Sequence, residues 1–183
     1  GPNGPKNPLQ DEYEAGYSAM QEELAALAEQ YAQLEVQTEK LTNSYREELS
    51  ALDENAQGYA ENKKELEALI AKGETLEKTL AAQSASVEKQ SISLQKLNEK
   101  VGKIGYQKAI QEQNKMGLSL GVMTKTFEQT EQQVSNYAEA WNNKLAKAQE
   151  KATRDEQKYQ ATLKVTGKTY EELTQLYLER SDK

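Results

Sequence analysis

The side chains that most often carry enzyme chemistry are absent, since the 183-residue chain contains neither cysteine nor histidine. Thiolate nucleophiles, zinc fingers, iron–sulfur sites, imidazole bases and Ser-His-Asp triads are therefore excluded. Carboxylates, lysines, tyrosines and hydroxyl groups remain. Adjacent acids such as Glu22-Glu23, Glu47-Glu48 and Glu171-Glu172 project apart on a helix, which makes them poor acid–base pairs.

Short motifs with a known mechanism are equally scarce. No phosphate-binding loop, dinucleotide fingerprint, HExxH or calcium-loop pattern occurs. Gly117 and Gly121 have GxxxG spacing, but the apolar stretch around them falls short of the roughly 20 residues that span a bilayer. We therefore expect no catalytic, cofactor-binding or metal site, no membrane-spanning segment and no enzymatic activity.

Charge narrows the range of partners. The chain carries 23 basic and 30 acidic residues, a net charge of −7, which disfavours direct contact with nucleic acid or an anionic membrane. Residues 11–39 contain eight acids and no base, whereas residues 144–168 contain seven bases and three acids. An antiparallel pairing of two helical arms would bring these two segments close together, although both are also compatible with ordinary solvated helix faces.

The spacing of apolar residues predicts long helices. All three prolines lie within the first eight residues, so the strongest helix breaker is absent from the rest of the chain. Tyr17, Tyr31, Tyr45 and Tyr59 are each 14 residues apart, or two heptads. The register that they define, in alternating steps of three and four, continues to Ile104, and 19 of its 26 positions are apolar. Sustained periodicity of 3.5 residues is typical of a coiled coil.

Glycines indicate where the helices should break. The register fails after Ile104, where Gly102 and Gly105 weaken the helix, and a new apolar frame begins at Ile110. Asp53 to Asn55 before Gly58 could form a turn, but the unbroken register favours a continuous helix there. Gly167 suits a helix end, and Thr169 with Glu172 matches a capping box that restarts a helix.

These patterns predict an all-α protein of long coiled-coil helices. We expect a disordered tag or linker over residues 1–9, a long heptad helix over 10–101, a break over 102–109, a second helical arm over 110–166 and a short capped helix over 167–183. An antiparallel hairpin of the two arms, with its break near Gly102–Gly105, is the favoured arrangement. An extended parallel homo-oligomeric coiled coil is the alternative.

The apolar seam is the candidate binding surface, because one seam per chain buries little and favours self-association or a helical protein partner. The predicted seam residues are Tyr17, Leu24, Leu27, Tyr31, Leu34, Leu41, Tyr45, Leu52, Tyr59, Leu66, Leu69, Leu80, Leu94, Leu97, Phe127 and Trp141.

The chain resembles the helical segments of tail tape measure proteins of long-tailed bacteriophages, particularly those of Gram-positive hosts. The similarity lies in proline-free helices rich in Gln, Glu, Lys and Ala, in heptads such as Leu34-x6-Leu41 and Leu94-x2-Leu97, and in the restart from Gly167 to Leu173. This resemblance implies a structural rod or spacer in a virion tail. The alternative is an extracellular or secreted bacterial interaction module, such as an adhesin stalk or secretion-system component.

Overall fold

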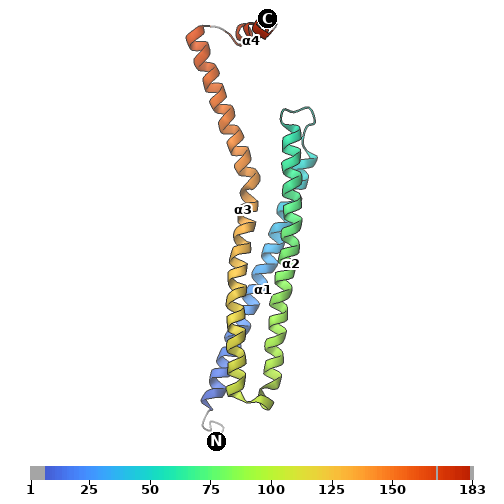
Figure 1. Ribbon diagram of the computed structural model, residues 1–183, viewed down its shortest axis with the longest axis vertical. Coiled ribbons are helices and arrows are strands. Elements are labelled where there is room, and N and C mark those ends of the chain that lie inside the picture. Colours follow the sequence, from blue (N-terminus) through green and yellow to red (C-terminus); the bar gives the residue numbers. More distant parts are fainter. Residues whose placement is uncertain (1–6, 168, 182–183) are drawn as a thin grey trace. The chain divides into compact units, whose positions relative to one another are not determined.

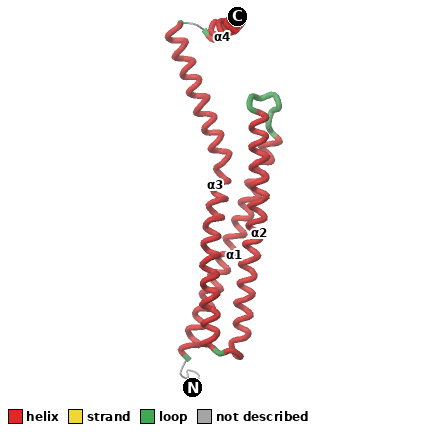
Figure 2. The backbone as a smooth tube through the Cα atoms, in the orientation of Figure 1, coloured by secondary structure: helices red, strands yellow, loops and turns green. Residues whose placement is uncertain are grey.

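The computed structural model describes residues 7–167 and 169–181, and every element in these ranges is an α-helix. The helices are α1 (Pro8–Ser50), α2 (Tyr59–Ile104), α3 (Tyr106–Thr166) and α4 (Tyr170–Ser181), joined by short turns (Figures 1 and 2). The all-α prediction is confirmed. None of the described helices is long and apolar enough to cross a membrane.

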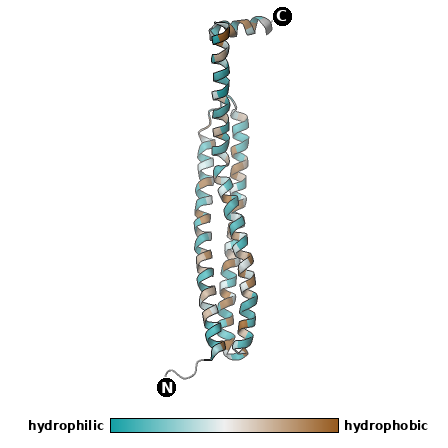
Figure 3. Cartoon of the chain, turned by 90° about the vertical axis from the view of Figure 1, so that its left-hand side faces the viewer, coloured by the Kyte–Doolittle hydropathy of each residue, from teal (hydrophilic) through white to brown (hydrophobic). Residues whose placement is uncertain are grey.

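The chain divides into two compact units, one reaching Ala138 and the other beginning at Glu139. In the first unit α1, α2 and residues 106–138 of α3 pack side by side, and Figure 3 shows apolar segments interleaved with polar ones along them. Their shared core is drawn from all three helices: Met20, Leu24, Leu27, Tyr31, Leu34, Leu80, Val87, Leu94, Leu120, Phe127 and Val134. The first unit is therefore a three-helix bundle.

The continuous helix expected over residues 10–101 is wrong, because residues 51–58 form a loop between α1 and α2. Asp53 Oδ1 accepts a hydrogen bond from Asn55 N (2.9 Å), and Ala56 N donates to Asp53 O (3.0 Å). Gly58 then adopts a left-handed conformation with φ 80°. Side-chain-to-backbone bonds of this kind compete with helix, and glycine tolerates positive φ without strain.

The second break is narrower than the predicted 102–109. Gly102 remains inside α2, and a single residue, Gly105, separates α2 from α3. Its φ of 84° and ψ of 159° belong to a region that side-chain-bearing residues avoid. Tyr106 to Ala109 are already helical. The chain thus reverses twice, at residues 51–58 and at Gly105, so three packed helices replace the two-arm hairpin.

The two ends of the chain also differ from the expectation. Residues 1–6 of the predicted linker over 1–9 lie outside the described part of the chain, but Pro8 and Leu9 belong to α1. Asn7 caps that helix by accepting a hydrogen bond from Leu9 N (3.0 Å). In the second unit, Gly167 has φ 68°, and Thr169 Oγ1 accepts a hydrogen bond from Glu172 N (3.3 Å) before α4. Residues 168, 182 and 183 of the predicted last segment, 167–183, lie outside the described part of the chain.

The acidic stretch 11–39 packs against α2 and against the first half of α3. Tyr13 contacts Asn98 and Gln113, and Tyr31 contacts Gln83 and Phe127. The helices α1 and α3 therefore run parallel in the bundle, with α2 antiparallel to both. The basic stretch that begins at Lys144 belongs to the second unit, so its expected pairing with the acidic stretch stays a prediction.

Candidate functional site: the polar and aromatic layers of the bundle seam

Three layers of polar and aromatic side chains link the helices of the first unit. In the layer nearest Asn7, the Tyr13 hydroxyl donates to Asn98 Oδ1 (3.1 Å), and Gln113 Nε2 donates to the Tyr13 carbonyl oxygen (3.0 Å). The Tyr13 ring packs on Tyr17 and Tyr106, with centroids 6.1 and 5.9 Å away. One tyrosine thus contacts all three helices.

The middle layer is built around Gln83 of α2. Its Oε1 accepts hydrogen bonds from the Tyr31 hydroxyl and from Thr130 Oγ1, both at 3.0 Å. The edge of Tyr31 meets the Phe127 ring in a T-shaped contact, with centroids 5.0 Å apart. A polar residue in a predicted apolar register is therefore satisfied by one donor from each neighbouring helix, which fixes the register of all three helices.

In the third layer α2 closely approaches the side chains of α1 and α3. Thr42 Oγ1 and the Tyr137 hydroxyl form a hydrogen bond of 3.0 Å, and the Tyr45 hydroxyl donates to the Tyr137 carbonyl oxygen. The rings of Tyr45 and Tyr137 meet edge to face at 5.1 Å. Gly73 of α2 faces this pair, and a Cβ atom there would collide with Thr42 Oγ1 and the Tyr137 hydroxyl. Glycine is thus required for the close approach of α2.

The electrostatics of these layers favour hydrogen-bond donation rather than proton transfer. Burial raises the pKa of Tyr13, Tyr31 and Tyr137 above the usual value of 10.0. For Tyr137 the hydrogen bond with Thr42 acts in the opposite direction but is the smaller effect. These hydroxyls therefore stay protonated at neutral pH. Within the described ranges, Asp and Glu form no group of three or more able to hold a metal ion.

Most residues of the predicted partner seam lie inside the chain's own core. The buried members are Leu24, Leu27, Tyr31, Leu34, Tyr45, Leu66, Leu80, Leu94, Leu97, Phe127 and Trp141. The half-buried members are Tyr17, Leu41, Leu52, Tyr59 and Leu69, with Leu52 in the loop that follows α1. The first unit therefore uses its seam to pack its own helices.

Sequence reasoning missed five buried residues that hold the layers together: Tyr13, Thr42, Gln113, Thr130 and Tyr137. Tyr13 precedes Tyr17 by four residues, so the register could have been extended backwards. The spacing of Phe127, Thr130, Val134, Tyr137 and Trp141 alternates between three and four, and this pattern could have identified Thr130 and Tyr137. Gly117, seven residues after Ile110 in the second apolar frame, is exposed.

One of the buried seam residues, Trp141, belongs to the second unit. Trp141 is 5 % exposed, and the Lys144 ammonium nitrogen lies 5.5 Å from the centroid of its ring, a cation–π distance. Farther along α3, Leu145, Ala148 and Ala152 are exposed. Beyond Trp141 the apolar spacing of α3 therefore continues through exposed side chains as far as Ala152.

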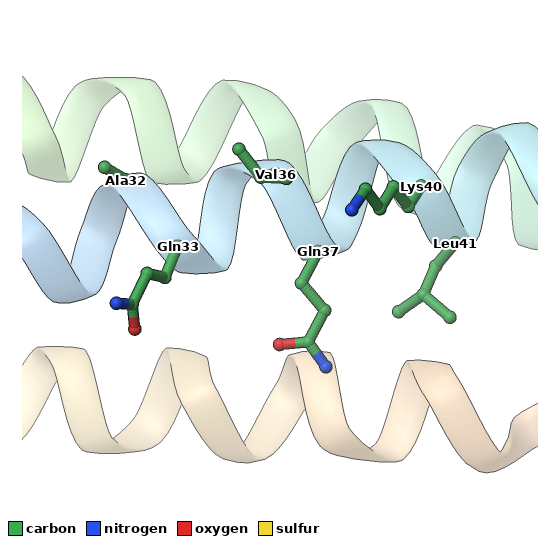
Figure 4. Close-up of a pocket in the computed structure, with 6 residues that line it drawn as sticks. All are labelled: Ala32, Gln33, Val36, Gln37, Lys40 and Leu41. Carbon is green, nitrogen blue, oxygen red and sulfur yellow. The ribbon is translucent and has the colours of Figure 1, made fainter.

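An exposed groove lies on α1, where Ala32, Gln33, Val36, Gln37, Lys40 and Leu41 enclose about 610 Å³. Figure 4 shows Gln33, Gln37 and Leu41 projecting from one side of the helix, and Ala32 and Val36 from the other. None of these residues is a carboxylate, a hydroxyl or a thiol. Lys40 is the charged residue among them, and the groove offers mainly apolar contact area.

Comparison of the chain with protein-family models, with curated proteins and with solved structures finds no match.

Proposed function

We propose that this chain is a structural spacer, a tape-measure-like coiled-coil rod of a bacteriophage tail, in which helix length is the functional quantity. The observation that carries the proposal is the length of the helices: α1, α2 and α3 contain 43, 46 and 61 residues. At about 1.5 Å per residue they extend roughly 65, 70 and 90 Å. Helices of this length far exceed the average of globular proteins, which is about 11–12 residues.

The internal layers suit a spacer because they set the alignment of the helices. Each layer joins α1 to its neighbours through directional contacts, such as those of Gln83 with Tyr31 and Thr130. Polar groups buried in this way disfavour shifted registers, in which they would lose their partners. A rod whose helices cannot slide past one another keeps a defined length.

The proposal includes the partners of the rod. The chain acts without catalysis, by self-association or by binding a helical protein, and it makes no direct contact with nucleic acid. The net charge of −7 supports the last point, because a polyanion repels an acidic surface. The apolar side chains of Val36, Leu145 and Leu178, between 48 and 51 % exposed, support self-association or the binding of a helical protein.

The location of the protein in assembled particles tests this function. Tails are purified from phage or induced prophage of the organism that encodes the chain, and their proteins are identified by mass spectrometry. We expect the chain in tails that are separated from unassembled protein on a density gradient. Its recovery only from the cell envelope or the culture medium would contradict the proposal and favour a surface or secreted module.

A further inference from the structure

The segment 144–166 of α3, here named the tail segment, combines an apolar line with a basic one. It contains six basic and three acidic residues. The line runs through Leu145, Ala148, Ala152 and Tyr159 and is interrupted by Asp155. A basic residue directly precedes each of these five positions, in the pairs Lys144-Leu145, Lys147-Ala148, Lys151-Ala152, Arg154-Asp155 and Lys158-Tyr159. Because consecutive residues are about 100° apart on a helix, the basic stripe runs alongside the apolar line. Such a surface fits an acidic helix with small side chains.

The complementary surface is the side of α1 opposite its buried residues, here named the acidic face. It is rich in exposed alanines, among them Ala15, Ala19, Ala26 and Ala32, which allow another helix to approach closely. Exposed glutamates Glu22, Glu29 and Glu39 lie among them, and the apolar groove at Val36 continues the surface. Residues 11–39 include eight acids and no base, so the acidic face is strongly anionic.

We propose that the tail segment of one copy docks on the acidic face of a second copy of this chain. Two tail segments repel each other, as do two acidic faces, so unlike charges leave only the tail-on-face pairing. Since each copy offers one surface of each kind, the contact is heterologous and joins copies head to tail. This inference rests on the self-association proposed for the rod, and it assigns the surfaces that produce it.

Two triple variants test the pairing, and all six substituted side chains are exposed, so neither should disturb the fold. Circular dichroism and melting temperature verify this for each variant. The tail variant is Lys147→Glu/Lys151→Glu/Arg154→Glu, and the face variant is Glu22→Lys/Glu29→Lys/Glu39→Lys. Sedimentation velocity over a wide range of concentrations measures association of the full chain. We expect the wild type to associate, with weaker association at high salt because charges are screened.

Each variant alone should associate about tenfold to a hundredfold more weakly, since three exposed charge pairs become repulsive. A mixture of the two variants should associate again, because the basic tail of the face variant meets the acidic face of the tail variant. The matched control reverses three exposed charges of α2 outside both surfaces, in Lys63→Glu/Lys72→Glu/Lys78→Glu, and should associate like the wild type.

Three outcomes would overturn the docking. A wild type that is monomeric at every concentration contradicts both the docking and the self-association of the rod. Association that survives both reversals contradicts the assigned surfaces alone. Loss of association in both variants without recovery in the mixture contradicts the tail-on-face pairing. None of these results depends on whether the chain occurs in phage tails, so failure of the docking and failure of that location remain distinguishable.

Discussion

Gly73→Ala tests the packing of the three-helix bundle at its closest point. The new Cβ atom would collide with Thr42 Oγ1 and with the Tyr137 hydroxyl, which form a hydrogen bond with each other. Overpacking a core costs about 1–3 kcal/mol. Separating the two hydroxyls destabilises the protein by about 1 kcal/mol more. The higher helix propensity of alanine stabilises it by about 1 kcal/mol. The net destabilisation should therefore be about 1–3 kcal/mol.

Urea unfolding followed by circular dichroism at 222 nm measures this change in stability. The signal at this wavelength reports α-helix, which makes up nearly all of the described chain. Gly121→Ala is the matched control, because it lies inside α3 and a Cβ there meets nothing within 4 Å. It should stabilise the protein by about 0.5–1 kcal/mol. Adding Thr42→Ala and Tyr137→Phe to Gly73→Ala should recover part of the loss. Equal stability of Gly73→Ala and Gly121→Ala would refute the close approach of α2.

Further predictions concern the middle layer, alkaline pH and the first loop. Tyr31→Phe removes the hydrogen bond to Gln83 and should cost about 1 kcal/mol in urea unfolding, whereas an unchanged midpoint would show that the bond contributes nothing. Burial raises the pKa of Tyr13, Tyr31 and Tyr137 in the folded protein. Their contribution to stability is therefore complete below the pKa of about 10 that tyrosine has in the unfolded chain, and it is lost as pH rises through their pKa values in the folded protein. Melting temperature should therefore fall above pH 10, less steeply in Tyr31→Phe than in the wild type, and parallel curves would contradict this assignment. Gly58→Ala, at φ 80°, should lower stability by about 1–2 kcal/mol, and a neutral effect would contradict the left-handed turn.

The sequence predicted the helices well because their signal is local and repeated. Apolar spacing places Leu24, Leu27 and Tyr31 on one face of α1 whatever lies against that face, and the structure buries all three. Glycine also marks local events, as at Gly105 and Gly167, where the backbone requires positive φ.

The loop at 51–58 was missed for a physical reason. Leu52 and Tyr59 are seven residues apart, as a heptad requires, so the loop preserves the phase of the register although the chain reverses direction. Periodicity alone cannot separate a continuous helix from two helices joined in phase. The turn chemistry of Asp53 and Gly58 decides between them, and it favours two helices.

The layers could be predicted only in part, because they depend on which helices meet. Gln83 occupies a position of the apolar register, but its partners Tyr31 and Thr130 lie 52 and 47 residues away. A periodic pattern identifies a buried face without saying what covers it. The number of helices in the bundle therefore came from the structure.

The central claim, that helix length sets a distance, is tested most directly by matched changes of length in the phage that encodes the chain. Removing residues 20–26, 87–93 and 117–123 deletes one heptad from each helix between the Tyr13 and Tyr31 layers, and it keeps the remaining core positions in phase. At 1.5 Å per residue the bundle becomes shorter by about 10 Å. Removing residues 20–26 alone is the control, which misaligns α1 with its neighbours and should destabilise the protein.

The decisive measurement is the mean tail length in electron micrographs of many particles, for the matched deletion, the wild type and the matching duplication of the same three heptads. We predict that length changes in the order deletion, wild type, duplication, in proportion to the number of heptads. Tails that assemble at an unchanged length with all three chains would contradict the claim that helix length is the function of this protein.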